Sequence, residues 1–154
     1  MSKTLLRPPV PDDALRIVAL AKQFSAANPS ASKSALNDIE RLSTIVPNLI
    51  SMSSGDIIVA EQNATVIGVT VFSVVPSLVH AGRPTLFVDL LVVDEFHRRQ
   101  GVGSCLVEHL VRKSAELNAY KLLLVSREDN LAAQALYRKF SFSVNGLGLA
   151  KYLA

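Results

Sequence analysis

The sequence predicts a single α/β domain spanning residues 1–154, with antiparallel and parallel strands in one sheet and about four flanking helices. Three observations lead to this prediction. With 154 residues, of which 49% are hydrophobic and 19% charged, the chain can bury a sizeable core. Residues 56–75 read as two strands joined by a turn, which is a hairpin. Residues 86–125 read as strand, helix and strand, which implies a parallel pair with a right-handed crossover.

The elements before the hairpin are short and amphipathic. Thr4–Arg7 is expected to form a strand. A helix is expected from Pro11, because acidic residues fill its first turn, and Asn28-Pro29 should close it. The apolar spacing predicts a second amphipathic helix over 32–45, and the serine-rich stretch 47–55 is expected to be a loop.

The middle of the chain supplies the strands of the expected sheet. Residues 56–60 and 65–75 form the predicted hairpin, with Gly68 as a candidate bulge or kink. The connector 76–84 leads into residues 86–93, an almost unbroken apolar run rich in β-branched types. Such a run is typical of a buried strand, so we expect it near the middle of the sheet.

A basic, glycine-rich loop follows this strand and opens a helix. From position 97 it reads HRRQGVG, and apolar residues then return at helical spacing. Gly101 and Gly103 let the backbone approach a ligand closely. The first helical turn has N–H groups without internal partners and lies at the positive end of the helix dipole. Arg98 and Arg99 add donors that match phosphate oxygens, so the loop predicts a pyrophosphate site.

Two common nucleotide-binding patterns do not fit this loop. The dinucleotide fingerprint G-x-G-x-x-G fails at Leu106, and the Walker A pattern is absent. The pattern that remains, R-x-x-G-x-G over residues 98–103, resembles the acetyl-CoA loop of the GCN5-related N-acetyltransferases (GNAT). Residues 130–142 also resemble the N-x-x-A-x-x-L-Y-x-K-x-G-F pattern of that family, with Ser141 in place of its glycine.

This resemblance implies a GNAT acyl-CoA N-acyltransferase fold, in which a mixed, mostly antiparallel sheet has a central parallel pair splayed around the coenzyme. Acetyl-CoA is then the cosubstrate, no metal is needed, and the segments 11–29 and 32–45 line the acceptor site. The implied coenzyme contacts come from the strand, the loop and the last helix. They are Leu91, Val92, Val93, Arg98, Arg99, Gln100, Gly101, Val102, Gly103, Ser104, Asn130, Ala133, Tyr137 and Lys139.

Two side chains are candidates for catalysis. The resemblance implies that Tyr137 protonates the departing thiolate, and a phenol with its usual pKa of about 10 carries a proton at neutral pH. Its alternative role is aromatic packing on an amphipathic helix. Asp89 is an acid inside an apolar strand, where burial would raise its pKa and suit it to accept a proton. General base, anchor for a cation and partner in an ion pair all stay open for Asp89.

The function that follows is transfer of the acetyl group from acetyl-CoA to a primary amine of a small molecule or peptide, by direct attack in a ternary complex. Two alternatives stay open: a catalytically silent GNAT-like module that senses acyl-CoA, and a nucleotide-binding module outside the family. The net charge of +3 comes without a Lys/Arg stripe, so a nucleic-acid partner is not expected. No apolar run approaches the length of a membrane span.

The remaining expectations concern location and assembly. The single cysteine, Cys105, excludes an internal disulfide, and residues 1–10 show no signal-peptide pattern, so a cytoplasmic protein is expected. The segment after Phe142 is short for the last hairpin of the family, although Asn145-Gly146 is a turn signal. Completion of that arm by a partner chain, in a homodimer, is an open alternative.

Overall fold

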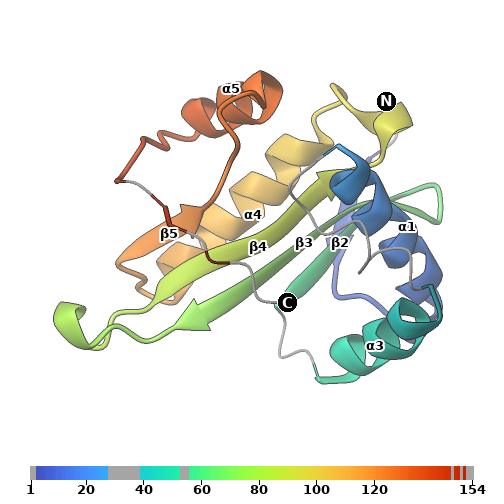
Figure 1. Ribbon diagram of the computed structural model, residues 1–154, viewed down its shortest axis with the longest axis horizontal. Coiled ribbons are helices and arrows are strands. Elements are labelled where there is room, and N and C mark those ends of the chain that lie inside the picture. Colours follow the sequence, from blue (N-terminus) through green and yellow to red (C-terminus); the bar gives the residue numbers. More distant parts are fainter. Residues whose placement is uncertain (1–2, 28–38, 53–55, 147, 150, 152–154) are drawn as a thin grey trace.

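The computed structural model describes residues 3–27, 39–52, 56–146, 148–149 and 151. Their strands form one five-stranded sheet in chain order, with helices on both faces (Figure 1). The strands are β1 (Leu5–Arg7), β2 (Ile57–Gln62), β3 (Thr65–Val75), β4 (Thr85–Val93) and β5 (Lys121–Leu124). The α-helices are α1 (Ala14–Ala26), α3 (Ile39–Met52), α4 (Val102–Glu116) and α5 (Leu131–Lys139). The short 3₁₀ turns are η1 (Pro11–Asp13), η2 (Leu78–His80) and η3 (Glu95–His97).

Two hydrophobic clusters, one on each face, hold the sheet between its helices. On one face α1 and α3 pack against β2, β3 and β4, with Leu20, Val59 and Val69 fully buried. On the other face α4 packs through Leu106 and Leu110, which are also fully buried. Because successive side chains of a strand point to opposite faces, the strands β2, β3 and β4 contribute to both clusters.

The predicted hairpin is confirmed, and its bulge lies beside Gly68. Asn63 and Ala64 both have positive φ, as a two-residue hairpin turn requires. Ala60 pairs with Gly68 and Glu61 pairs with Val66, so the register shifts by one residue between these pairs. Gly68 lies directly under α4: a Cβ there would come within 3.2 Å of the Val92 carbonyl oxygen and 3.3 Å of Leu106 Cδ1. Gly68 therefore allows the close approach of strand and helix.

The helix expected over 32–45 has different bounds. Residues 32–38 lie outside the described residues, and α3 continues to Met52, so the loop predicted from residue 47 is wrong for residues 47–52. Pro47 lacks an N–H and removes one helical hydrogen bond. The helix nevertheless continues because Val46 and Ile50 are both buried in the core below it.

The parallel pair predicted from the strand–helix–strand order is confirmed. Strands β4 and β5 are parallel and pair from Thr85 with Lys121 to Val88 with Leu124. The pair was expected at the centre of the sheet, but it stands at the edge of the sheet that the structure describes, because the described residues after Phe142 form no strand. None of the described helices is long and apolar enough to cross a membrane.

Candidate coenzyme and acceptor site

The candidate site begins where β4 and β5 stop pairing. The last pair is Val88 with Leu124, but β4 continues to Val93. Five residues of β4 therefore have no strand beside them on the β5 side in the described sheet. At about 3.3 Å per residue, this open edge is about 16 Å long. It can accept an extended ligand as an added strand.

The backbone groups on the open edge are those of Leu91 and Val93. The Asp94 N–H donates to the Ile67 carbonyl at 2.8 Å, and the Leu90 carbonyl accepts from Thr70 Oγ1 at 2.9 Å. Both of those groups face β3. Since backbone groups alternate along a strand, Leu91 and Val93 point to the open edge. One of these backbone groups, the Val93 carbonyl, accepts a hydrogen bond from Arg98 Nε at 3.1 Å. The side chain of Val92 is buried in the core, and by the same alternation its backbone groups face β3 rather than the open edge.

The loop after β4 has a left-handed backbone at two places. Arg99 has a φ of 61° and Gly101, which caps α4, has a φ of 85°. Within the described residues, the N–H groups of Val102, Gly103 and Ser104 make no hydrogen bond. The side chains of Arg98, Arg99 and Gln100 are exposed. These donors, at the positive end of a 15-residue helix, form a concave anion site of the kind that holds phosphates.

The two glycines of the loop have different roles. A Cβ at Gly101 would meet nothing within 4 Å, so Gly101 is required for its backbone conformation alone. A Cβ at Gly103 would lie 3.1 Å from Leu136 Cδ2, on α5. A side chain at position 103 would therefore press on the helix that carries Tyr137, so its effect on the coenzyme would not be separable from an effect on α5.

The substitution Gly101→Ala is therefore the cleaner test of the loop. An alanine held at positive φ costs about 1–2 kcal/mol, so we expect coenzyme A to bind about 5- to 30-fold more weakly while the fold is unchanged. Isothermal titration with coenzyme A measures this. Gly82→Ala is the matched control, since Gly82 also has positive φ and open space around it but lies in the β3–β4 connection. Equal affinity of both variants would show that the loop does not bind the coenzyme.

A buried carboxylate, Asp94, fixes the loop to α1. Asp94 is only 2% exposed and lies at the end of β4. Its Oδ2 accepts from Arg16 Nη2 at 2.6 Å and from Gln23 Nε2 at 3.0 Å, while Oδ1 lies 2.9 Å from His97 Nδ1. Oδ1 also accepts from the Phe96 N–H at 3.1 Å. Burial acts to raise the pKa of Asp94, but these bonds outweigh it and hold that pKa well below its usual range.

Sequence reasoning missed this cluster. Arg16 and Gln23 are seven residues apart on α1, so they share one face of the helix. The available signal was the acidic pair Asp94-Glu95 directly between a buried strand and a basic loop. The partners of Asp94, however, are separated from it by 71 and 78 residues, and no local pattern reveals them.

Helix α5 carries the second predicted motif. Asn130 is its N-cap, and Asn130 Oδ1 accepts from the Ala133 N–H at 3.2 Å. Tyr137 is partly exposed and packs against Phe142, with ring centroids 5.6 Å apart. Its hydroxyl makes no hydrogen bond within the described residues, and burial raises the pKa of Tyr137 above its usual value. The phenol therefore keeps its proton at neutral pH. Lys139 is exposed at the end of the helix.

Asp89 lies in a second bulge. Val71 pairs with Leu90 and Phe72 pairs with Val88, which leaves Asp89 as the extra residue of β4. The side chain is exposed, so the burial expected from its place in an apolar strand does not occur. Val88 belongs to the cluster beneath α4, and successive side chains of a strand point to opposite faces. The exposed Asp89 is thus on the opposite face, beside the first unpaired residue of the open edge.

Comparison with known proteins identifies the family. A model described as the acetyltransferase (GNAT) family matches residues 20–142. The chain belongs to the GNAT family. The matched residues include β4, the loop after it (the anion loop, residues 98–101), α4, β5 and α5, which are the elements that form the candidate site. No curated protein matches the chain.

Solved structures agree with this fold. Ribosomal-protein-alanine N-acetyltransferase from Brucella melitensis biovar Abortus 2308 is 18% identical, with a TM-score of 0.77 over 98% of this chain and 99% of that chain. Glucosamine-6-phosphate N-acetyltransferase from Arabidopsis thaliana is 18% identical, with a TM-score of 0.77 over 99% of each chain. A structure from Bacillus halodurans C-125 described as a transcriptional regulator is 17% identical, with a TM-score of 0.81 over 98% and 100%. At such identities the likeness shows the fold alone.

The site of this GNAT chain fits a coenzyme A molecule. The N–H groups of Val102, Gly103 and Ser104 are suitable donors for a pyrophosphate, and the open edge at Leu91 and Val93 suits an extended chain with amides. In the described residues there is no group of three or more His, Cys, Asp or Glu side chains that could hold a metal ion.

Proposed function

We propose that this protein is an N-acetyltransferase that moves the acetyl group of acetyl-CoA to a primary amine in a ternary complex. The thioester supplies an activated acetyl group. The backbone N–H of Leu91 faces the open edge of β4, where it can donate to the thioester oxygen as negative charge gathers there. Asp89 lies on the exposed sheet face at the start of this edge, where an incoming amine can reach it.

The bonds exchanged in this reaction assign roles to two side chains. The amine nitrogen forms the new C–N bond and the C–S bond breaks. Asp89, directly or through water, takes a proton from the amine, and Tyr137 gives its proton to the departing sulfur. Tyr137 is suited to this role because its hydroxyl carries a proton and is not engaged in a hydrogen bond within the described residues.

One observation carries the proposal: an open strand edge, an anion site at the start of α4 and an unengaged tyrosine hydroxyl occur together. Thiol release from acetyl-CoA, measured with and without amines, tests it. Amine-dependent release of free coenzyme A is expected. Protection from thermal unfolding by coenzyme A with no thiol release from any amine would instead support the acyl-CoA sensor. Protection by ATP or NAD but not by coenzyme A would overturn both.

The substitution Asp89→Asn separates acceptor chemistry from coenzyme binding. Asparagine keeps the size of the side chain and removes its charge and basicity, so we expect kcat/KM for the amine to fall by about 10²–10⁴-fold. The affinity for acetyl-CoA should stay within twofold, because Asp89 has no partner in the described chain and the fold does not depend on it. Steady-state kinetics with titration of acetyl-CoA checks both values. A variant with full activity would show that Asp89 has no role at the acceptor.

A further inference from the structure

The side chains on the acceptor side of the sheet restrict which amines can bind there. Two apolar residues lie beside Asp89. They are Leu90, which follows it on β4, and Val71 on β3, which is the register partner of Leu90. Both pack against the core beneath α1 and α3 and remain partly exposed. Asp89 therefore stands at the margin of an apolar surface.

This apolar surface continues along β4 to β5. Phe87 and Leu123 are register partners across the parallel pair. Their neighbours Val88, Leu122 and Leu124 belong to the cluster on the α4 side, so Phe87 and Leu123 are on the Asp89 face. Both are partly exposed.

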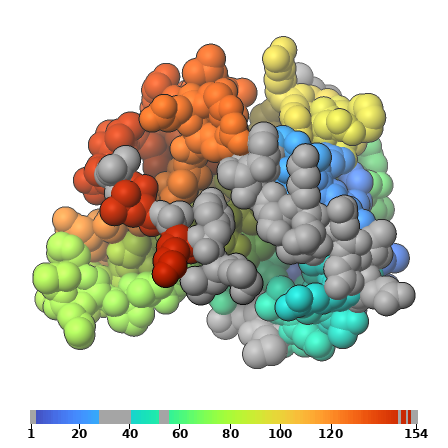
Figure 2. Space-filling view, viewed as in Figure 1, coloured from blue at the N-terminus to red at the C-terminus, as the bar shows by residue number. Residues whose placement is uncertain are grey.

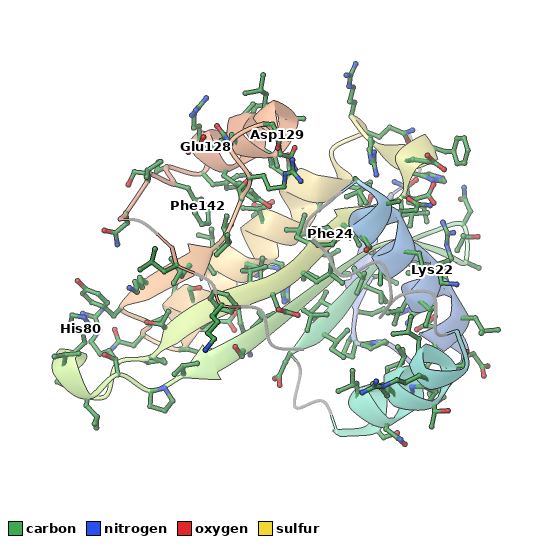
Figure 3. The ribbon with its side chains drawn as sticks, in the orientation of Figure 1. Lys22, Phe24, His80, Glu128, Asp129 and Phe142 are labelled. Atoms are coloured by element: carbon green, nitrogen blue, oxygen red, sulfur yellow. The ribbon has the colours of Figure 1, made fainter. Side chains whose placement is uncertain are left out.

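Helix α1 contributes the last member. The Phe24 side chain extends from α1 toward the strands, and it is partly exposed while packing on the same core as Leu90 (Figure 3). Figure 2 shows the same side of the molecule, with the orange atoms of α5 and the blue atoms of α1 in separate parts of the view. We call these five side chains the sheet patch: Phe24, Val71, Phe87, Leu90 and Leu123.

The charges near the sheet patch are few. Asp89 makes no hydrogen bond or ion pair within the described residues, whereas the acids Asp13, Asp94 and Asp129 are all ion-paired elsewhere. Lys121 is on the same face at the far end, beside Thr85 in the register. Four residues separate Thr85 from Asp89, which is about 13 Å of strand. Within strands β3, β4 and β5, Asp89 is the one acid and Lys121 the one cation, so a second positive charge on the amine would approach Lys121 and find no acid on these strands.

We propose that the acceptor is a monoamine with an apolar aliphatic or aromatic body, and that polycationic amines are excluded. This rests on the proposed acetyl transfer. Asp89 holds the single ammonium group, and the body of the amine covers the sheet patch. A second ammonium group on the body would approach Lys121 and would lose water on an apolar surface.

A series of straight-chain amines from ethylamine to hexylamine tests the proposal on the unaltered protein. Each methylene buried on the sheet patch contributes about 0.8 kcal/mol, so kcat/KM should rise about fourfold per methylene. Phenethylamine should exceed spermidine and kanamycin by at least about tenfold. A flat series, or faster transfer to the polycations, would overturn the apolar-amine proposal while leaving acetyl transfer intact. No transfer to any amine would overturn the proposed function itself.

The variant Leu123→Asn tests whether the dependence on chain length arises at the sheet patch. It should lower the fourfold increment per methylene to twofold or less, while the affinity for coenzyme A stays within twofold of the parent. Val111→Asn is the matched control, because Val111 is a 40% exposed valine on α4, which packs on the opposite face of the sheet. Equal chain-length dependence in both variants would overturn the assignment to the sheet patch. A circular dichroism melt verifies that both variants fold. If Leu123→Asn does not fold, the amine series on the parent protein decides the proposal.

Discussion

Replacement of Tyr137 by Phe is expected to lower kcat by about 10²–10⁴-fold and to leave the affinity for coenzyme A nearly unchanged. The substitution keeps the ring that packs on Phe142 and removes only the hydroxyl. Because that hydroxyl has no hydrogen-bond partner in the described chain, stability should change little. Its raised pKa keeps it protonated, so it is a proton donor rather than a base.

Single-turnover and steady-state rates of thiol release measure this loss. Tyr120→Phe is the matched control, since Tyr120 is 47% exposed and stacks on His80 at the other end of the molecule, with ring centroids 3.4 Å apart. An unchanged kcat in Tyr137→Phe would mean that water protonates the thiolate. A large drop in melting temperature would instead mean that the hydroxyl supports the fold.

The substitution Asp94→Asn is expected to lower the free energy of unfolding at pH 7 by about 1–3 kcal/mol, because it replaces a buried carboxylate oxygen that accepts hydrogen bonds with an amide NH₂ that cannot accept them. It should also weaken coenzyme binding, since Asp94 anchors the turn that precedes Arg98.

The pH dependence of this effect has a defined sign. The folded-state pKa of Asp94 is depressed, so its contribution is present above the unfolded pKa of about 4 and is lost as pH falls through the folded value. The gap in stability between the parent and Asp94→Asn should therefore narrow below about pH 4 in urea titrations. Asp129→Asn is the control, because the exposed pair of Asp129 with Arg127 is screened by solvent. A gap that stays constant down to pH 2 would contradict the role of the charge.

Features with a local sequence signal were predicted well. The order of strand, loop and helix through β4 and α4 depends on residues within a few positions of each other, so spacing alone reveals it. The continuation of α3 through Pro47 was missed because the cost of proline is local, whereas the burial of Val46 and Ile50 depends on strands distant in sequence.

Features that depend on pairing between segments could not be predicted. The bulge at Asp89 exists because β3 and β4 differ by one residue in their register, which neither strand shows by itself. Asp89 is the extra residue of this bulge and its side chain is exposed, whereas its place in an apolar run had suggested burial. The contacts of Asp94 with α1 are equally distant in sequence.

The close approach of Gly103 to Leu136 restricts which substitutions can accumulate in this chain. With only 3.1 Å between a Cβ at position 103 and Leu136 Cδ2, a larger residue at 103 requires the Leu136 side chain to shift or position 136 to become smaller. The two positions should therefore covary in related sequences, and Leu136→Ala should rescue Gly103→Ala in a double-mutant cycle. Through this one contact, a substitution at the start of α4 is coupled to the helix that carries Tyr137.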